Sequence, residues 1–411
     1  MVAPGMFLAV VNDVIVLLRN RSLFVVSAGS AKAVEFELLQ EPEVQLDASK
    51  ADDDDDEPQP QQPQQHGVPP SNRITGVQFF LPSAQSPYAL LLLVDDRKLV
   101  HYDVDFAAGS VAFRSTRALP RGATCMAVGH LEKDGERKHV VIVGVKTGEA
   151  LAMPFPDIAR DIKTLLGHTT SMLTQLAINK DSSLLLTADR DEKIRVSAFP
   201  RTSLIQSYCL GHAASLTEVA ASLLTPELAV STSLDNTIKL WGIASGELLA
   251  SQELLKDEPM NSKNLLNASL AVSAQSNLVA VVLNNQCVRL FAIVAREGQS
   301  PVLENVDVSA DLQKQLNANE PCEACFTSGG ELVLSHKNAP FVSFYNVTKT
   351  DGESVEIAPG SPVDEAALAQ VRAKFATIEL AAVGDEEVDE LEEHGLKKKK
   401  VKTEWKAKVL Q

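Results

Sequence analysis

Short apolar runs recur along the chain at fairly regular intervals, and polar turn residues separate them. The runs are rich in Val and Leu, four to eight residues long, and bounded by Gly, Asn, Asp or Ser; examples are "VIVLL", "HVVIVGV", "LVAVVLNN" and "FVSFYNV". Runs of this length and composition predict β-strands. The pattern therefore predicts an all-β fold.

Two neighbouring segments repeat each other with an offset of 44 residues, namely "LLGHTTSMLTQLAINKDSSLLLTADRDEKIRVS" and "CLGHAASLTEVAASLLTPELAVSTSLDNTIKLWG". Five positions match without an insertion: His168 with His212, Thr187 with Ser231, Asp191 with Asp235, Ile194 with Ile238, and Ser197 with Trp241. Internal repetition of this period is typical of repeat architectures. The pattern resembles the WD repeat, in which each repeat forms one four-stranded blade of a β-propeller.

The resemblance to the WD repeat implies a buried, hydrogen-bonded tetrad of His, Ser or Thr, Asp and Trp. A buried carboxylate needs donors, which His and Ser or Thr supply, and the Trp indole adds an apolar plug with one donor. The second repeat supplies His212, Ser231, Asp235 and Trp241. The first supplies His168, Thr187 and Asp191, with Ser197 at the Trp position, so that network is incomplete. We assign these residues a structural role.

Weaker copies of the repeat bring the count to about seven blades, within the usual range for propellers. We therefore predict a seven-bladed WD-repeat β-propeller over residues 1–350. Its first strand, Met6–Val11, is the candidate for closing the ring by pairing with the last blade. Residues 51–73, acidic and then rich in Pro and Gln, are predicted to be a disordered insertion.

An amphipathic helix is predicted over residues 361–380. Ser361 and Pro362 form a good start signal, and Leu368, Val371, Phe375 and Ile378 make one apolar stripe. This stripe fits docking either on the propeller or on a partner. Residues 384–411 carry an acidic and then a basic block, which predicts a flexible charged tail.

Composition and motifs restrict the classes of function. The net charge of −16 argues against a whole-surface electrostatic grip on nucleic acid. No apolar run reaches the length of a membrane span, the first residues read as strands and not as a signal peptide, and five cysteines fit a reduced compartment. The chain has no Gly-rich phosphate loop and no G-x-S-x-G or H-E-x-x-H motif. Cys322 and Cys325 form one CxxC pair, whereas a structural zinc site needs two more ligands. We therefore expect no catalytic residues, no metal and no cofactor.

Residues 171–212 carry a more specific motif. The run "SMLTQLA … LLLTADRDEKIRVSAFPRTSLIQSYCLGH" is similar to the non-catalytic WD-repeat subunit of tRNA (guanine-N7-)-methyltransferase. The resemblance implies a heterodimer in which this chain does no chemistry. It would hold a separate catalytic subunit that binds S-adenosylmethionine and methylates N7 of the variable-loop guanosine in tRNA. S-adenosylmethionine is then expected on the partner only, and tRNA is reached through the complex.

The same resemblance implies a role for the charged turn in "TADRDEKIRVS". It makes Arg190, Glu192, Lys193 and Arg195 candidates for binding the catalytic subunit. The alternatives are a solvated turn for Glu192 and Lys193 and packing between blades for Arg195. Lys239 holds the position equivalent to Arg195 in the next repeat, so a basic residue there is not diagnostic alone.

The basic run "LKKKKVK" at residues 396–402 fits a nuclear-import signal or a phosphate-binding arm, and we expect a nuclear protein. Two other classes of function stay open from the residues. One is a WD-repeat scaffold of a different complex, such as a ubiquitin-ligase adaptor. The other is a propeller enzyme that uses its central channel.

Overall fold

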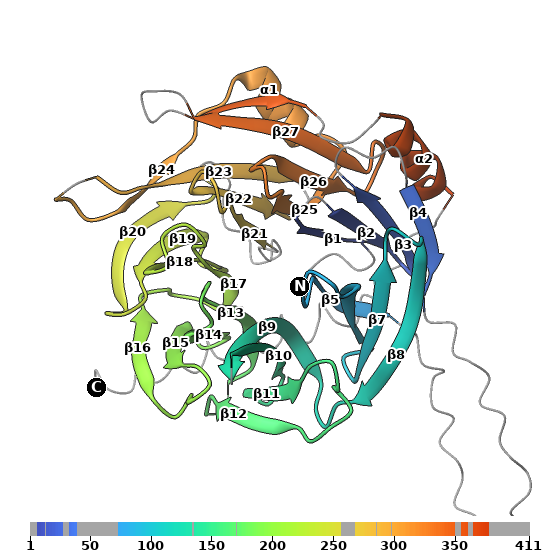
Figure 1. Ribbon diagram of the computed structural model, residues 1–411. Helices are drawn as coiled ribbons and strands as arrows, with labels where there is room; N and C mark the ends of the chain where they lie inside the picture. Colours follow the sequence, from blue (N-terminus) through green and yellow to red (C-terminus); the bar gives the residue numbers. More distant parts are fainter. Residues whose placement is uncertain are drawn as a thin grey trace, which may run out of the picture. The chain divides into compact units, whose positions relative to one another are not determined.

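The chain forms a ring of seven four-stranded antiparallel sheets (Figure 1). The computed structural model describes residues 6–12, 14–27, 33–38, 73–133, 135–169, 171–255, 268–284, 286–296, 298–349, 355–360 and 365–377. The prediction of a seven-bladed β-propeller is confirmed. The predicted insertion, apart from Arg73, and the predicted tail lie outside the described residues.

Each blade is made of four consecutive strands. Blade 1 contains β1 (Met6–Val11), β2 (Val14–Arg19), β3 (Ser22–Ser27) and β4 (Ala33–Glu37), and blade 2 contains β5 (Ile74–Phe80), β6 (Tyr88–Val94), β7 (Lys98–Asp105) and β8 (Ser110–Ala118). Blade 3 contains β9 (Ala123–Lys133), β10 (Glu136–Val145), β11 (Glu149–Pro154) and β12 (Lys163–Gly167), and blade 4 contains β13 (Leu173–Ile178), β14 (Leu184–Asp189), β15 (Lys193–Ala198) and β16 (Ile205–Leu210). Blade 5 contains β17 (Leu216–Ala221), β18 (Leu228–Ser233), β19 (Thr237–Gly242) and β20 (Glu247–Glu253), and blade 6 contains β21 (Ala268–Val272), β22 (Leu278–Leu283), β23 (Cys287–Val294) and β24 (Val302–Asn305). Blade 7 contains β25 (Pro321–Phe326), β26 (Leu332–His336), β27 (Val342–Lys349) and β28 (Val355–Pro359).

The position of a strand within its blade explains its composition. The second strands lie between the sheets of two neighbouring blades, and β2, β18 and β22 are buried along their whole length. Strands that are buried on both faces read as continuous apolar runs. The outer strand β8, in contrast, has no fully buried residue. The runs seen in the sequence are therefore mostly the inner three strands of each blade.

The ring is not closed by exchange of a strand, so the prediction that Met6–Val11 pairs with the last blade is wrong. β1 pairs with β2 of its own blade, and β25 to β28 form a complete sheet. The physical reason is that the chain itself supplies all four strands of blade 7. The outermost of these, β28, ends at Pro359, beyond the predicted propeller boundary at residue 350.

Side chains join blade 7 to blade 1 in place of a shared strand. The backbone N–H of Leu8 donates to Oε2 of Glu323 at 2.6 Å. The thiol of Cys325 donates to the carbonyl oxygen of Leu8 at 3.5 Å. Two residues of β25 thus satisfy both backbone groups of one residue on the inner edge of β1. A buried sheet edge left without such partners would be costly.

Two helices lie at the perimeter beside blade 7 (Figure 1): α1 (Ala310–Leu316) and α2 (Glu365–Phe375). Helix α2 occupies the centre of the predicted 361–380 segment. Its residues Leu368, Val371 and Phe375 are buried in one cluster with side chains of β1 to β3 and β26 to β27. The rings of Phe375 and Phe24 meet edge to face at 4.4 Å between centroids. The apolar stripe of α2 therefore docks on the propeller and covers the seam between blades 7 and 1.

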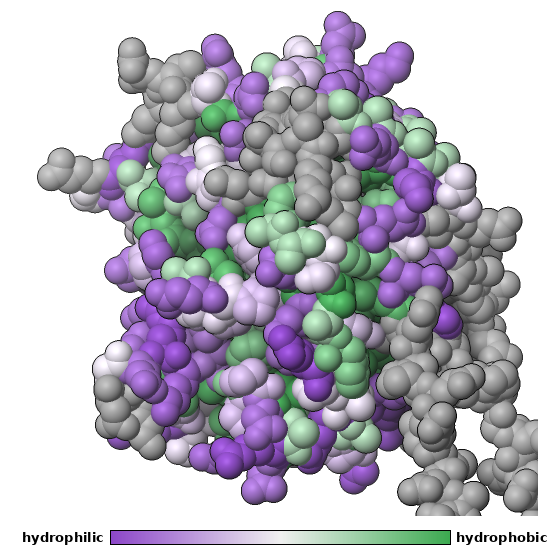
Figure 2. Space-filling model, turned by 45° about the vertical axis from the view of Figure 1, so that its right-hand side comes forward, coloured by the Kyte–Doolittle hydropathy of each residue, from purple (hydrophilic) through white to green (hydrophobic). Residues whose placement is uncertain are grey.

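Polar and apolar side chains are mixed over the face seen in Figure 2. Within the described ranges, no helix has the length and apolar character needed to cross a membrane.

The seam makes the stability of the fold depend on pH. Burial, with a smaller contribution from the nearby Glu218, raises the pKa of Glu323 to about 8 against the opposing effect of the Leu8 N–H bond. The folded state therefore binds more protons than the unfolded state between pH 4.5 and about 8. The stabilisation that protonated Glu323 contributes is complete below this window and is lost as pH rises through it. The free energy of unfolding then falls by at most ~1.4 kcal/mol per pH unit.

We expect Glu323→Gln to flatten this dependence, since glutamine still accepts the N–H of Leu8 but does not titrate. Urea unfolding at several pH values, for the wild type and the variant, measures the effect. Burial also raises the pKa of Glu218 to about 7, so some dependence should remain in the variant. Identical pH profiles for the two proteins would show that Glu323 is not the titrating group.

Candidate interaction surface

The charged turn lies between β14 and β15 in blade 4. The N–H of Arg190 donates to the carbonyl of Met172 at 2.9 Å, and the N–H of Asp191 donates to Oγ of Ser171 at 3.2 Å. Glu192 has a positive φ of 75°, as a tight turn requires. Of the four candidate partner-binding residues, Lys193 is exposed and Arg190, Glu192 and Arg195 are half-buried. The structure thus brings all four to one end of blade 4.

The carboxylate in the blade 4 network comes from Asp189, not from Asp191 as the repeat spacing predicts. Nδ1 of His168 lies 2.9 Å from Oδ2 of Asp189, and Nε2 of His168 lies 2.7 Å from Oγ1 of Thr187. Burial alone would raise the pKa of Asp189, but the bonds from His168 and from the N–H of Lys193 hold it below its ordinary value. The assignment of Asp191 to the tetrad is therefore wrong.

Blade 5 has all four members of its network in contact. Nδ1 of His212 lies 2.9 Å from Oδ2 of Asp235, and Nε2 of His212 lies 2.8 Å from Oγ of Ser231. Nε1 of Trp241 donates to the same hydroxyl at 2.8 Å. Burial opposes ionisation of Asp235, but the bonds from His212, from the hydroxyl of Thr237 and from the N–H of Ala213 hold its pKa below the ordinary value.

The two blades differ because the carboxylate reaches the same donors from different positions. In blade 5, Asp235 accepts the N–H of Thr237, two residues later. In blade 4, Asp189 accepts the N–H of Lys193, which lies four residues later and is equivalent to Thr237. Asp189 lies at the end of a strand and Asp235 in a turn, so spacing alone does not distinguish the two positions.

Arg195 is engaged within its own blade. Its Nε donates to Oγ of Ser197 at 3.0 Å, and its Nη2 donates to the carbonyl of Thr202 at 2.7 Å. Ser197 is fully buried and stands where blade 5 has Trp241. The side chain of Arg195 therefore bonds the hydroxyl that replaces the indole. The next repeat behaves similarly, because Nζ of Lys239 donates to Oγ of Ser251 at 2.8 Å.

The sequence interpretation missed an apolar row beside these charges. Leu204, Ile205, Tyr208 and Leu210 of blade 4 and Leu248 of blade 5 are all exposed, Tyr208 by 42% and Leu210 by 59%. We call these five residues the blade 4–5 edge. Tyr208 pairs with Arg195 across the strands, and Leu210 pairs with Lys193. Directly paired residues share one face of a sheet, so charged and apolar side chains alternate here.

The blade 4–5 edge is held rigidly against the next blade. Oγ of Ser207 donates to the carbonyl of Ile243 at 2.6 Å, which ties β16 to the turn after β19. Gly246 in this turn has a φ of 74°, and a Cβ there would lie 2.3 Å from the carbonyl oxygen of Tyr208. Only glycine permits this approach. The signal in the sequence was the apolar composition of "SLIQSYCL", which an exposed outer strand does not need.

The described residues show neither a cluster of metal ligands nor, in the CxxC pair, a reactive thiol. They contain no group of three or more His, Cys, Asp or Glu side chains that could hold a metal ion. Cys322 and Cys325 are free, and burial raises the pKa of each thiol to about 12. Both are therefore protonated and unreactive near neutral pH.

The position of the carboxylate in blade 4 can be tested by mutation. We expect Asp189→Ala to lower the free energy of unfolding by about 1–3 kcal/mol, because it leaves His168 and the N–H of Lys193 without their partner. Asp235→Ala is the matched reference in blade 5, and Asp191→Ala should cost clearly less than either. Chemical denaturation of the three variants measures the order. A larger loss for Asp191→Ala than for Asp189→Ala would contradict the network described above.

Comparison with known proteins gives consistent results. Residues 156–324 match the family model of the tRNA methyltransferase TRM82 WD40 domain. Two solved structures share the fold: a chain of a mitotic checkpoint complex (TM-score 0.56, 16% identity, 84% of this chain and 92% of that chain) and the β-propeller domain of Cps50 (Swd1) from Myceliophteria thermophila (TM-score 0.55, 11% identity, 85% and 98%). At these identities they support the fold alone.

Three curated relatives are each named as a tRNA (guanine-N(7)-)-methyltransferase non-catalytic subunit. They are wuho of Culex quinquefasciatus (30% identical, 49% of this chain and 47% of the relative), WDR4 of Homo sapiens (33%, 39% and 40%) and trm82 of Aspergillus oryzae (34%, 43% and 41%). The chain spans less than half the length of these relatives. The resemblance that the sequence predicted, to the WD-repeat non-catalytic subunit of tRNA (guanine-N7)-methyltransferase, is thereby confirmed.

Proposed function

We propose that this chain is the non-catalytic scaffold of a tRNA (guanine-N7)-methyltransferase, and that it binds the catalytic subunit through the blade 4–5 edge. The observation that carries the proposal is the apolar row of this edge beside Lys193 and Arg195, within the matched segment 156–324. The names of the relatives support the division of labour, in which the partner performs the methyl transfer.

The composition of the edge suits a protein interface. It combines an aromatic side chain and several leucines with basic residues paired directly to them, and aromatic residues and arginine are enriched in specific interfaces. The hydroxyl bond of Ser207 and the close approach of Gly246 tie the strand to blade 5 before a partner arrives, so little conformational entropy is lost on binding. Lys193 also lies 3.8 Å from Asp189 and is still 45% exposed, which leaves it accessible to an acidic group on the partner.

The geometry assigns different roles to the charged candidates. Arg195 holds Ser197 and Thr202 inside blade 4, so reversing its charge should also destabilise the blade. Lys193 and Tyr208 are better probes of the interface because their side chains are exposed.

We expect Tyr208→Ser to weaken binding of the catalytic subunit by about 2 kcal/mol or more, the usual cost of losing an aromatic anchor. Phe113→Ser is the matched control, since Phe113 is also an aromatic residue on an outer strand, 49% exposed, but in blade 2. Calorimetric titration with the catalytic subunit measures both affinities, and thermal melts verify the fold. Equal affinities of the two variants would place the interface elsewhere.

The scaffold role also predicts that the isolated chain binds no S-adenosylmethionine. The reason is that its sequence has no Gly-rich cofactor loop. Titration of the pure chain with S-adenosylmethionine should give no heat of binding, whereas the complex with the catalytic subunit serves as the positive control. Micromolar binding by the isolated chain would contradict the role.

A further inference from the structure

Exposed apolar side chains are concentrated on two of the seven blades. Among the residues that the structure describes, eight large apolar or aromatic side chains are exposed, and seven of them belong to blades 4 and 5. Five of the seven form the blade 4–5 edge. The other two are Leu223, 39% exposed, and Leu224, 44% exposed, in the turn between β17 and β18. A single exposed leucine is ordinary, whereas a gathering of this kind marks an interaction site.

The turn that carries these two leucines, residues 222–227, differs from the equivalent turns of other blades. We call it the blade 5 turn; its sequence is "SLLTPE". The turn between the first two strands is "NKDSS" in blade 4, "SAQSN" in blade 6 and "TSGGE" in blade 7. A connection at this place is therefore made without large apolar residues. The two leucines serve neither the turn nor the core, which leaves a contact outside the fold.

The blade 5 turn is held in one conformation by its own hydrogen bonds. Ser222 is fully buried, and its Oγ accepts the N–H of Thr225 at 2.9 Å. The N–H of Ser222 donates to the carbonyl of Leu228 at 2.9 Å, and the N–H of Leu228 donates to the carbonyl of Thr225 at 3.0 Å. The two leucines thus lie between fixed residues, and a partner meets an ordered surface.

The blade 5 turn is joined to the blade 4–5 edge through one intervening turn. The N–H of Ile243 donates to the carbonyl of Glu227 at 2.8 Å. The carbonyl of the same Ile243 accepts from Ser207, and Nε2 of Gln206 donates to the carbonyl of Ala244 at 3.4 Å. One residue after β19 therefore bonds both the blade 5 turn and β16. Figure 1 shows blades 4 and 5 side by side in the ring.

The blade 4–5 edge is too small to be a complete interface. A specific interface takes roughly 20–30 residues from each partner, and the edge supplies five. At one end of β16, Leu210 pairs with Lys193 of the charged turn. Toward the other end, exposed apolar side chains continue onto the blade 5 turn. An apolar partner surface that covers the edge can therefore extend in that direction.

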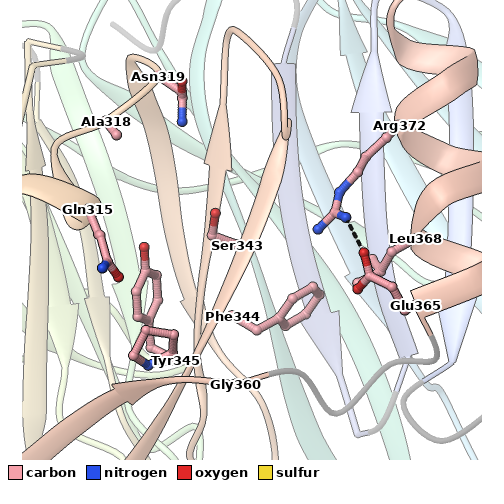
Figure 3. Close-up of a pocket in the computed structure, with 11 residues that line it drawn as sticks. Gln315, Ala318, Asn319, Ser343, Phe344, Tyr345, Gly360, Glu365, Leu368 and Arg372 are labelled. Atoms are coloured by element: carbon pink, nitrogen blue, oxygen red, sulfur yellow. Dashed lines mark hydrogen bonds and ion pairs between the residues drawn. The ribbon is translucent and has the colours of Figure 1, made fainter. Parts of the chain in front are cut away.

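The cavity of about 530 Å³ beside blade 7 has a different character (Figure 3). Phe344 and Leu368 line it, but both are buried in the core. Nη1 of Arg372 donates to Oε1 of Glu365 at 2.5 Å, so the charged groups of the lining are paired with each other. The described lining thus presents no exposed apolar surface comparable with the blade 5 turn.

We propose that the catalytic subunit binds the blade 5 turn as well as the blade 4–5 edge, and that it buries Leu223 and Leu224. This inference rests on the proposed scaffold function and gives the interface two parts on neighbouring blades. The partner then needs aliphatic or aromatic side chains opposite the two leucines. Two contacts that are separated along the ring also fix the orientation of the catalytic subunit, which a single row of side chains does not.

The test replaces the two leucines by the residues that blade 4 has in its own turn, Lys180 and Asp181. The full chain with Leu223→Lys and Leu224→Asp together should bind the catalytic subunit at least about tenfold more weakly, because two apolar contacts are lost. The matched control is Ala84→Lys with Gln85→Asp, at exposed positions in the equivalent turn of blade 2. Its affinity should stay within about twofold of the wild type. Calorimetric titration measures the affinities, and thermal melts verify the fold.

A second measurement uses the unmodified chain and does not depend on the folding of a variant. In hydroxyl-radical footprinting, Leu223 and Leu224 should lose reactivity when the catalytic subunit binds, as Tyr208 should. Phe113 of blade 2 is exposed to a similar extent and should keep its reactivity.

The outcomes separate this inference from the proposed function. If Tyr208→Ser weakens binding, but the variant of the blade 5 turn does not and both leucines stay reactive, the inference is wrong and the scaffold function stands. If neither variant weakens binding, both fail. Sedimentation of the isolated chain covers another occupant: a dimer that the variant of the blade 5 turn abolishes would assign the turn to a second copy of the chain and overturn the inference.

Discussion

The inner edges of the seven sheets impose the constraint on which the rest of the fold depends. The inner strand of each blade has one edge with no strand beside it in its sheet, and the described strands of blades 7 and 1 stay within their own sheets. Glu323 and Cys325 bond both backbone groups of Leu8 instead. Helix α2 then buries Phe375 against Phe24 and closes the seam from outside. A ring built in this way relies on a few side chains at one place, and one of them is a carboxyl group with a raised pKa.

Side chains also connect other neighbouring blades across the inner strands. Nε2 of Gln78 donates to the carbonyl of Met126 at 3.1 Å, between blades 2 and 3. Gln175 of blade 4 donates to the carboxyl group of Glu218 in blade 5. Long polar residues on inner strands are therefore part of the structure, which explains why Glu and Gln occur in otherwise apolar strands. Their presence there does not need a catalytic explanation.

The fold could be predicted from the sequence because propeller blades are local. Each blade consists of consecutive strands, so runs of apolar residues and the offset between His168 and His212 are enough to count them. The closure of the ring could not be predicted, since it depends on contacts between residues 8 and 323. Asp189 was missed because the repeat spacing identifies Asp191 as the equivalent of Asp235. Spacing does not show which of these two nearby carboxylates, Asp189 or Asp191, reaches His168. The blade 4–5 edge was missed because the apolar residues Tyr208 and Leu210 stand out only once their strand is known to be an exposed outer one.

The loss of the tryptophan in blade 4 has a consequence for the surface of that blade. In blade 5 the indole of Trp241 fills the space beside the Ser231 hydroxyl, and the basic residue Lys239 is buried. In blade 4 a small serine leaves room for the guanidinium of Arg195, which is fixed by Ser197 and Thr202. A positive charge is thus held in one orientation beside Tyr208, on the strand face where the apolar row begins. A charge that is already fixed loses little entropy when a partner binds, so the change in the core of blade 4 would favour the proposed interface at its edge.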